Sequence, residues 1–137
     1  MTVRTTGDLV FETERRLTLV EWSPRASGAL LRSDPADVSA GRIELRFTGA
    51  AAVCLREMLD GLRITLTRAV PDVVTATLGR GLRTGEHLYT LTSGTVTGWI
   101  VADGAHGLQH DLDQYEALSF ASRASGSRSL FSHGSAG

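Results

Sequence analysis

The sequence predicts an all-β fold, a single-domain antiparallel sandwich or barrel-like meander with at most a short helix near residues 50–60. Two segments, Arg42–Thr48 and Leu62–Arg68, alternate apolar and polar side chains. This period of two is typical of strands that have one face on a core and the other in water. Turn signals such as Ser93-Gly94 and Asp103-Gly104 separate short strand-like runs, which is the spacing expected of a sandwich or a barrel.

Further strands are expected where β-branched and aromatic residues lie between turn signals. They are Leu17–Trp22 with an extension back to Leu9, Ala29–Arg32, Val73–Leu78, Glu86–Thr92, Val96–Ala102 and Gln114–Phe120. The alternation places one set of apolar side chains on the inner faces of the strands. We therefore expect a common core that contains Leu45, Phe47, Leu62, Ile64 and Trp99.

The segment Ala50–Leu59 fits two structures. Leucine and methionine side chains between residues 55 and 62 recur at helical spacing, which favours a short helix. Alternatively, Ala52–Glu57 forms a strand and Asp60-Gly61 makes the turn into the next one, because Asp-Gly is a strong hairpin signal. We favour the strand and keep the helix as the alternative.

The composition excludes several kinds of chemistry. The chain has 137 residues and a net charge of −1, and all 14 of its Lys-plus-Arg residues are Arg. Without Lys, the chain has neither a Schiff-base lysine nor a Walker-type phosphate loop. A net charge this close to zero does not draw the chain to nucleic acid or to a membrane surface.

One domain is expected over residues 1–120, because a chain of this length can bury one sizeable core. Residues 121–137 are rich in Ser and Gly. Such a segment buries too little apolar surface to offset its ordering entropy. We therefore expect a flexible tail there, with Leu130 and Phe131 as its apolar anchors.

Cys54 is the single cysteine, so no disulfide can form within the chain. Its neighbours Val53 and Leu55 suggest that it is a buried core cysteine. The N-terminal residues lack the apolar core of a signal peptide, and no apolar stretch approaches the ~18 residues of a membrane helix. Together these features predict a cytoplasmic location.

One cluster resembles a metal site. His106 and His110 are four residues apart, so on a helix they would share a face and could hold a divalent ion together with Asp111. However, Gly104 and Gly107 interrupt such a helix, and no Glu follows the first His as in the metalloprotease motif. A polar loop with solvated histidines is the preferred interpretation, and a metal-binding protein or hydrolase that uses this cluster is an alternative.

Five short motifs share a pattern of strand and turn residues. They are Gly28 with Leu30–Ser33, Arg42–Gly49, Gly61–Ile64, Leu88–Leu91 and Gly98–Ala102. With these motifs the chain resembles an uncharacterised family of small β-rich proteins of high-GC bacteria, similar in style to the immunity proteins of bacterial toxin systems. The resemblance implies a β fold with a strand at Ala52–Glu57, and it implies no catalytic or ligand-binding residue.

The expected function is non-enzymatic protein binding, in its narrower form that of an immunity-type inhibitor, with no cofactor. The expected partner is another protein, a second copy of this chain included, rather than nucleic acid or a membrane. Arginine is favoured at interfaces for its planar fork and weak hydration, so the expected contacts are Arg42, Arg46, Arg56 and Arg63. A small-ligand binder with an apolar cavity near Trp99 is the other alternative.

Overall fold

The computed structural model describes residues 7–23, 28–33, 41–110 and 128–134. Within these residues, nine strands form one antiparallel sheet, accompanied by one short helix. The strands are β1 Gly7–Ser23, β2 Gly28–Ser33, β3 Arg42–Thr48, β4 Ala52–Cys54, β5 Met58–Thr67, β6 His87–Ser93, β7 Val96–Ala102, β8 Gly104–His110 and β9 Arg128–Gly134, and the helix is α1 Asp72–Leu78. Their order in the sheet is β4-β7-β6-β5-β1-β2-β3-β8-β9. The predicted all-β fold class is therefore confirmed.

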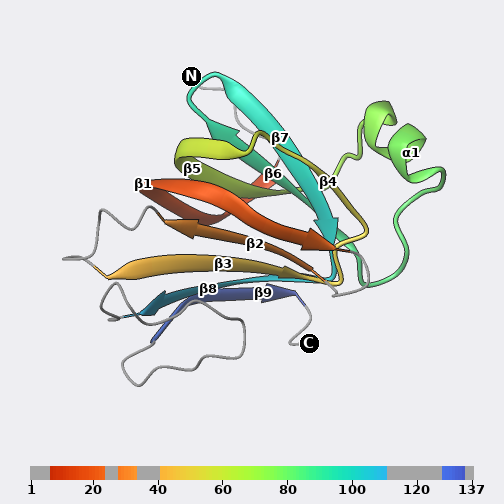
Figure 1. Cartoon of the computed structure of the whole chain (residues 1–137). Helices are drawn as coiled ribbons and strands as arrows, with labels where there is room; N and C mark the ends of the chain where they lie inside the picture. The colour runs from red at the N-terminus through yellow and green to blue at the C-terminus, as the bar shows by residue number, and fades with distance from the viewer. Residues whose placement is uncertain (1–6, 24–27, 34–40, 111–127, 135–137) are drawn as a thin grey trace.

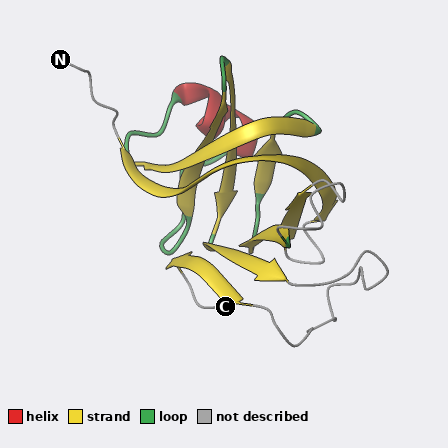
Figure 2. Cartoon of the chain, turned by 90° about the vertical axis from the view of Figure 1, so that its left-hand side faces the viewer, coloured by secondary structure: helices red, strands yellow, loops and turns green. Residues whose placement is uncertain are grey.

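The sheet curls because β1 is long enough to belong to both of its halves. The first part of β1 pairs with β5, and its last part, up to Ser23, pairs with β2. The pairing is irregular between Thr13 and Arg16, and an extra residue at such a position bends a strand. Figure 1 shows the result, with β5, β6 and β7 above β2, β3, β8 and β9 and with β1 between them. Figure 2 shows the same curled sheet turned by 90°.

The main core lies between the two halves of the sheet. Four of the five residues predicted for it are at most 3% exposed and belong to this cluster: Leu45, Phe47, Leu62 and Ile64. The ring of Phe47 meets Tyr89 of β6 edge to face, with centroids 5.6 Å apart. Trp99, the fifth predicted residue, is half-buried and packs instead in a second, smaller cluster beside α1.

The two halves also meet where β3 continues toward β4 and β7 continues toward β8. β3 pairs with β8, and β4 pairs with β7. Between these two ladders, the Asp103 amide donates to the Thr48 carbonyl at 2.8 Å. Gly49 allows the change of direction, because its φ is +62° and a side chain there would collide with the Asp103 carboxylate. Only glycine adopts such a conformation without strain.

The helix α1 stands where a strand was predicted over Val73–Leu78. Pro71 precedes the helix with φ −67°, and Gly79 ends it in the left-handed region with φ 74°. Proline at the start and glycine just past the end are helix boundary signals, and here they outweigh the strand preference of the β-branched residues. Val74 is 1% exposed and packs over the outer face of β6 and β7. This packing on the sheet stabilises the short helix, which would be marginal on its own.

The segment Ala50–Leu59 contains no helix. Its centre, Ala52–Cys54, forms β4, which confirms the strand interpretation there. Asp60-Gly61 does not turn the chain but lies within β5. Gly61 has φ +82° and lies opposite the irregular part of β1, so this glycine serves a bend within paired strands rather than a hairpin.

Part of the expected tail is structured. Arg128–Gly134 forms β9 and pairs with β8. Phe131 stacks on Phe11 of β1 with ring centroids 4.8 Å apart, and Gly107 leaves room for this ring, since a Cβ there would overlap it. Long-range pairing and one aromatic contact thus order a segment whose composition alone is that of a tail. The rest of the expected tail and the expected strand Gln114–Phe120 lie outside the described residues.

Phe131→Ala is expected to lower the free energy of unfolding by about 2 kcal/mol, because it removes a half-buried ring and its stacking on Phe11. Urea denaturation followed by circular dichroism measures this change. Ser129→Ala is the matched control, since Ser129 is exposed on the same strand, and it should cost less than about 0.5 kcal/mol. Equally small changes in both variants would show that β9 adds no stability.

Candidate functional site

The four arginines predicted to contact a partner do not gather on one surface. Arg42 and Arg46 share the outer face of β3, because they are an even number of residues apart on one strand. Arg63 lies on β5 opposite Glu12 of β1, and Arg56 lies in the connection between β4 and β5. Arg56 and Arg63 are exposed, whereas Arg42 and Arg46 are half-buried. Their role in partner binding stays a prediction.

Arg46 belongs to an ion-pair cluster on the outer face of β2 and β3. Glu44 is only 4% exposed, and its carboxylate accepts hydrogen bonds from Arg46 at 2.9 Å and from Arg32 at 3.1 Å. Burial raises the pKa of Glu44, but the two guanidinium groups outweigh this effect and hold the pKa below the usual 4.5. Arg46 already forms an ion pair with Glu44, so it is a weaker candidate for a partner contact than the exposed Arg56.

The residues of the metal-like cluster lie on a strand rather than in a loop or helix. His106 and His110 both belong to β8, because the backbone of this segment pairs with β3 on one side and with β9 on the other. Nδ1 of His106 lies 3.0 Å from Oγ of Ser132 on β9. Asp111 lies outside the described residues. Within the part of the chain that the structure describes, no group of three or more His, Cys, Asp or Glu side chains is placed to hold a metal ion.

Two other histidines, which the sequence did not single out, meet between β6 and β9. His87 of β6 and His133 of β9 contact each other edge to face, with ring centroids 5.1 Å apart. The hydroxyl of Tyr89 lies 2.8 Å from Nδ1 of His133, which is a hydrogen bond. Burial of Tyr89, with a smaller effect of the Asp103 carboxylate, raises the pKa of the phenol well above its usual 10.0. The phenol therefore stays protonated at every ordinary pH.

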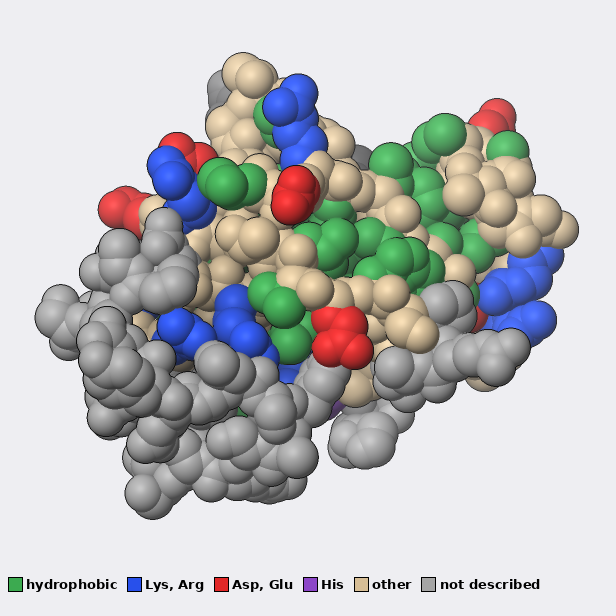
Figure 3. Space-filling model, viewed as in Figure 1, with side chains coloured by type: hydrophobic (Ala, Val, Ile, Leu, Met, Phe, Trp, Pro, Cys, Tyr) green, Lys and Arg blue, Asp and Glu red, His purple; other side chains and the backbone are tan. Residues whose placement is uncertain are grey.

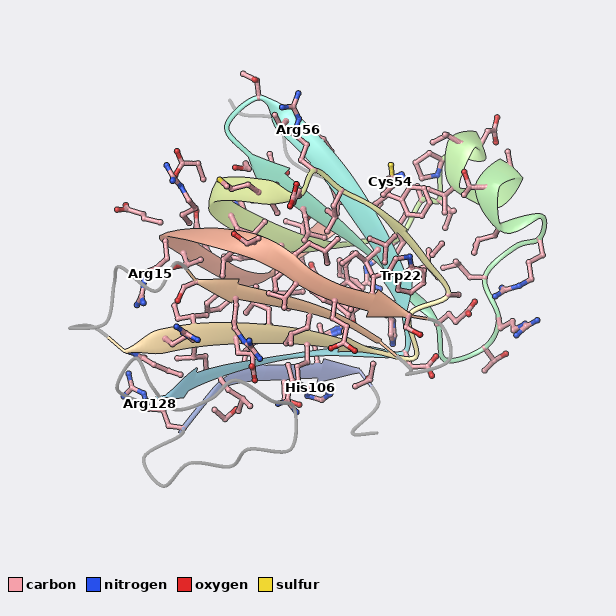
Figure 4. All side chains as sticks on the ribbon, viewed as in Figure 1. Arg15, Trp22, Cys54, Arg56, His106 and Arg128 are labelled. Carbon is pink, nitrogen blue, oxygen red and sulfur yellow. The ribbon has the colours of Figure 1, made fainter. Side chains whose placement is uncertain are left out.

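Half-buried apolar side chains occur on the last part of β1 and on β4, and the Leu19 amide of β1 donates to the Glu57 carbonyl just after β4 at 2.8 Å. Trp22 of β1 and Val53 and Leu55 at β4 are half-buried and pack against the main core; we call these three residues the β1–β4 surface. Figure 3 shows hydrophobic side chains gathered over this part of the molecule, and Figure 4 places Trp22 at the end of β1. Among the described strands, β4 is the last of the sheet and pairs only with β7.

Cys54 is exposed, although the sequence predicted a buried core cysteine. In β4 it pairs with Trp99 of β7, while its neighbour Val53 packs against the main core. Successive residues of a strand point to opposite faces. Val53 and Leu55 therefore face the main core, and Cys54, which lies between them, faces away from it.

Trp99 contributes to the packing of α1 on the sheet. It lies against the cluster formed by Val74, Leu88 and Val101. A groove of about 760 Å³ lies elsewhere, between β1, β5 and β6. Seven of its ten lining residues are polar or charged, and the full set is Glu12, Thr13, Glu14, Asp60, Gly61, Leu62, Arg63, Thr92, Ser93 and Gly94. This groove does not match the apolar cavity that a small-ligand binder near Trp99 would need.

Comparison with protein-family models found no match, and comparisons with curated proteins and with solved structures found none either. None of the helices in the described ranges has the length and apolar character needed to cross a membrane. The function must therefore be inferred from the residues and their arrangement.

Proposed function

We propose that the chain is a non-enzymatic protein-binding module that holds its partner on the β1–β4 surface, with Arg56 at the rim. The observation that carries this proposal is that Trp22, Val53 and Leu55 stay only half-buried beside the last strand of the sheet. An immunity-type inhibitor, the class that the sequence motifs resemble, is the narrower form of this proposal.

The geometry of β4 suits the addition of a partner strand. A strand at the edge of a sheet offers backbone N–H and C=O groups to another chain, and its side chains select which chain binds. The three residues of β4 carry no charge. Charged side chains on an edge strand usually disfavour pairing with another chain, and β4 has none. An extended apolar segment of the partner would pair with β4 and cover Trp22 and Val53.

The composition of this surface also fits an interface. Tryptophan and arginine are the side chains that most often dominate binding energy, with the apolar anchor at the centre and the charge at the rim. Arg56 directly follows Leu55 and is exposed. Of the four predicted arginines, Arg56 is therefore the one whose position the β1–β4 surface favours.

Trp22→Ala and Arg56→Glu are expected to weaken binding of a partner recovered from the native host and then purified. Trp22→Ala should raise Kd by roughly 30-fold, the effect of losing about 2 kcal/mol at an interface hot spot. Arg56→Glu should raise Kd by about fivefold or more, and the effect should shrink as salt screens the charge. Isothermal titration calorimetry at two salt concentrations measures both.

Arg63→Glu is the matched control, because it makes the same charge reversal at an exposed site on β5, three strands from β4 in the sheet order. It should leave Kd within about twofold. The melting temperature of each variant separates loss of binding from loss of folding. Weakening by Arg63→Glu alone would move the interface to β5, and failure to recover any protein partner would contradict the proposed function.

A further inference from the structure

Strand β9 ends the sheet on the side opposite to β4, and several of its side chains contact the other half of the sheet. Among the described strands it pairs only with β8. Phe131 stacks on Phe11 of β1, and His133 reaches Tyr89 of β6. Release of β9 would therefore break one ladder, these two contacts, the ring contact of His133 with His87 and the packing of Leu130 on the main core. It would leave the pairing of the other eight strands intact.

The contact between His133 and Tyr89 depends on the protonation state of the imidazole. In neutral His133 with its proton on Nε2, Nδ1 accepts a hydrogen bond from the Tyr89 hydroxyl. Protonated His133 carries a hydrogen on both nitrogens, so Nδ1 can only donate to the phenol oxygen, and the buried Tyr89 O–H is left without its acceptor. Tyr89 is 0% exposed, so water cannot easily replace the lost partner.

The charged groups around His133 also favour its neutral form. Burial is the main cause that lowers the pKa of His133, and His87 and Arg68 lower it further. Asp8 of β1 acts in the opposite direction, but its carboxylate is paired with Arg68 at 2.7 Å. Asp103 acts on the Tyr89 hydroxyl, on the other side of this hydrogen bond.

We propose that β9 is an acid-released latch: neutral His133 holds the strand by accepting a hydrogen bond from the buried Tyr89 hydroxyl. Protonation of His133 deprives this hydroxyl of its acceptor, adds a positive charge beside His87 and Arg68, and frees β9. The edge of β8 then becomes available to another strand. This conformational device is independent of the β1–β4 surface, which lies at the other end of the sheet order.

The direction of the pH effect follows from the lowered pKa. Above the ordinary histidine pKa of 6.5, His133 is neutral in both the fastened and the released state. Below 6.5 the released state takes up a proton more readily than the fastened state does, so acid favours release. The latch therefore holds at neutral pH and weakens progressively as the pH falls through 6.5.

Hydrogen exchange of the full chain, followed by mass spectrometry from pH 7.5 to pH 5.0 and corrected for intrinsic rates, tests this proposal. Protection of β8 and β9 peptides should fall by about tenfold over this range, the factor that corresponds to the net contribution of one hydrogen bond. Protection of β5 and β6 backbone amides should stay constant. A wild-type chain whose β9 protection does not change with pH, or changes equally in β5, would overturn the proposal.

Three variants locate the effect. His133→Gln replaces the imidazole by a neutral hydrogen-bonding group and should make β9 protection independent of pH. His87→Gln removes the neighbouring imidazole and should reduce the pH response. This variant decides the question if His133→Gln already releases β9 at pH 7.5. His106→Gln is the control, because His106 contacts Ser132 of β9 on the other face of the sheet, and it should keep the wild-type response. An unchanged response in both His87→Gln and His133→Gln would refute the latch.

Discussion

Phe47→Ala is expected to lower the free energy of unfolding by about 3–5 kcal/mol, the cost of removing a fully buried aromatic ring from a core. Phe47 is 1% exposed, and its ring meets Tyr89 across the two halves of the sheet. Its strand neighbours Ala29 and Ala105 are small, so they cannot fill the space that the ring would leave. Urea denaturation at neutral pH measures the change.

Leu9→Ala is the matched control for Phe47→Ala. Leu9 lies on β1 with 52% of its surface exposed, so its truncation should cost about 0.5 kcal/mol or less. A loss below about 1 kcal/mol for Phe47→Ala would contradict the register of β3, because a shift by one residue moves every side chain of a strand to the other face.

The strands that the sequence predicts best carry local signals, either alternation of apolar and polar residues or flanking turn residues. Arg42–Thr48 and Val96–Ala102 match β3 and β7 residue for residue. Alternation is a local property, so it can be read without knowledge of the neighbouring strands. It also placed Phe47 and Ile64 in the core.

The elements that the sequence missed depend on contacts made far along the chain. The backbone of β9 is ordered by pairing with β8 and by the contact of Phe131 with Phe11, and neither is visible in a stretch of Ser and Gly. The helix α1 differs, because Pro71 and Gly79 were local signals for it. There the β-branched residues predict a strand, and the boundary signals outweigh them.

The candidate sites were harder to predict than the strands. Trp22 and Val53 are distant in sequence, and only the curled sheet packs both of them against the same core. His87 and His133 are likewise separated along the chain, and neither lies in a sequence motif that indicates a functional site. Proximity in the sequence instead favours His106 and His110 as a candidate metal pair, although no metal-binding group forms around them among the described residues.

Glu44 is the one carboxylate of β3, and its ion pairs explain why a charged residue tolerates burial there. Its carboxylate lies between Arg32 and Arg46, whose side chains are 13% and 28% exposed. Removing one member of a buried ion pair leaves the others without compensation for their desolvation. Because Arg46 keeps partial contact with water, the cost should lie below that of a fully buried pair.

Glu44→Gln is therefore expected to lower the free energy of unfolding by about 2 kcal/mol at pH 7. The pKa of Glu44 is lower in the folded chain than its usual 4.5, so the stability that its charge contributes is present above pH 4.5 and is lost as the pH falls from there through the folded pKa. The difference between wild type and Glu44→Gln should accordingly shrink below pH 4.5, which urea denaturation between pH 7 and pH 3 measures.

Asp60→Asn is the control, since Asp60 and its partner Arg16 are 77% and 47% exposed, and an exposed pair contributes less than about 1 kcal/mol. A difference for Glu44→Gln that persists undiminished at pH 3 would mean that packing, rather than the charge of Glu44, stabilises this face of the sheet.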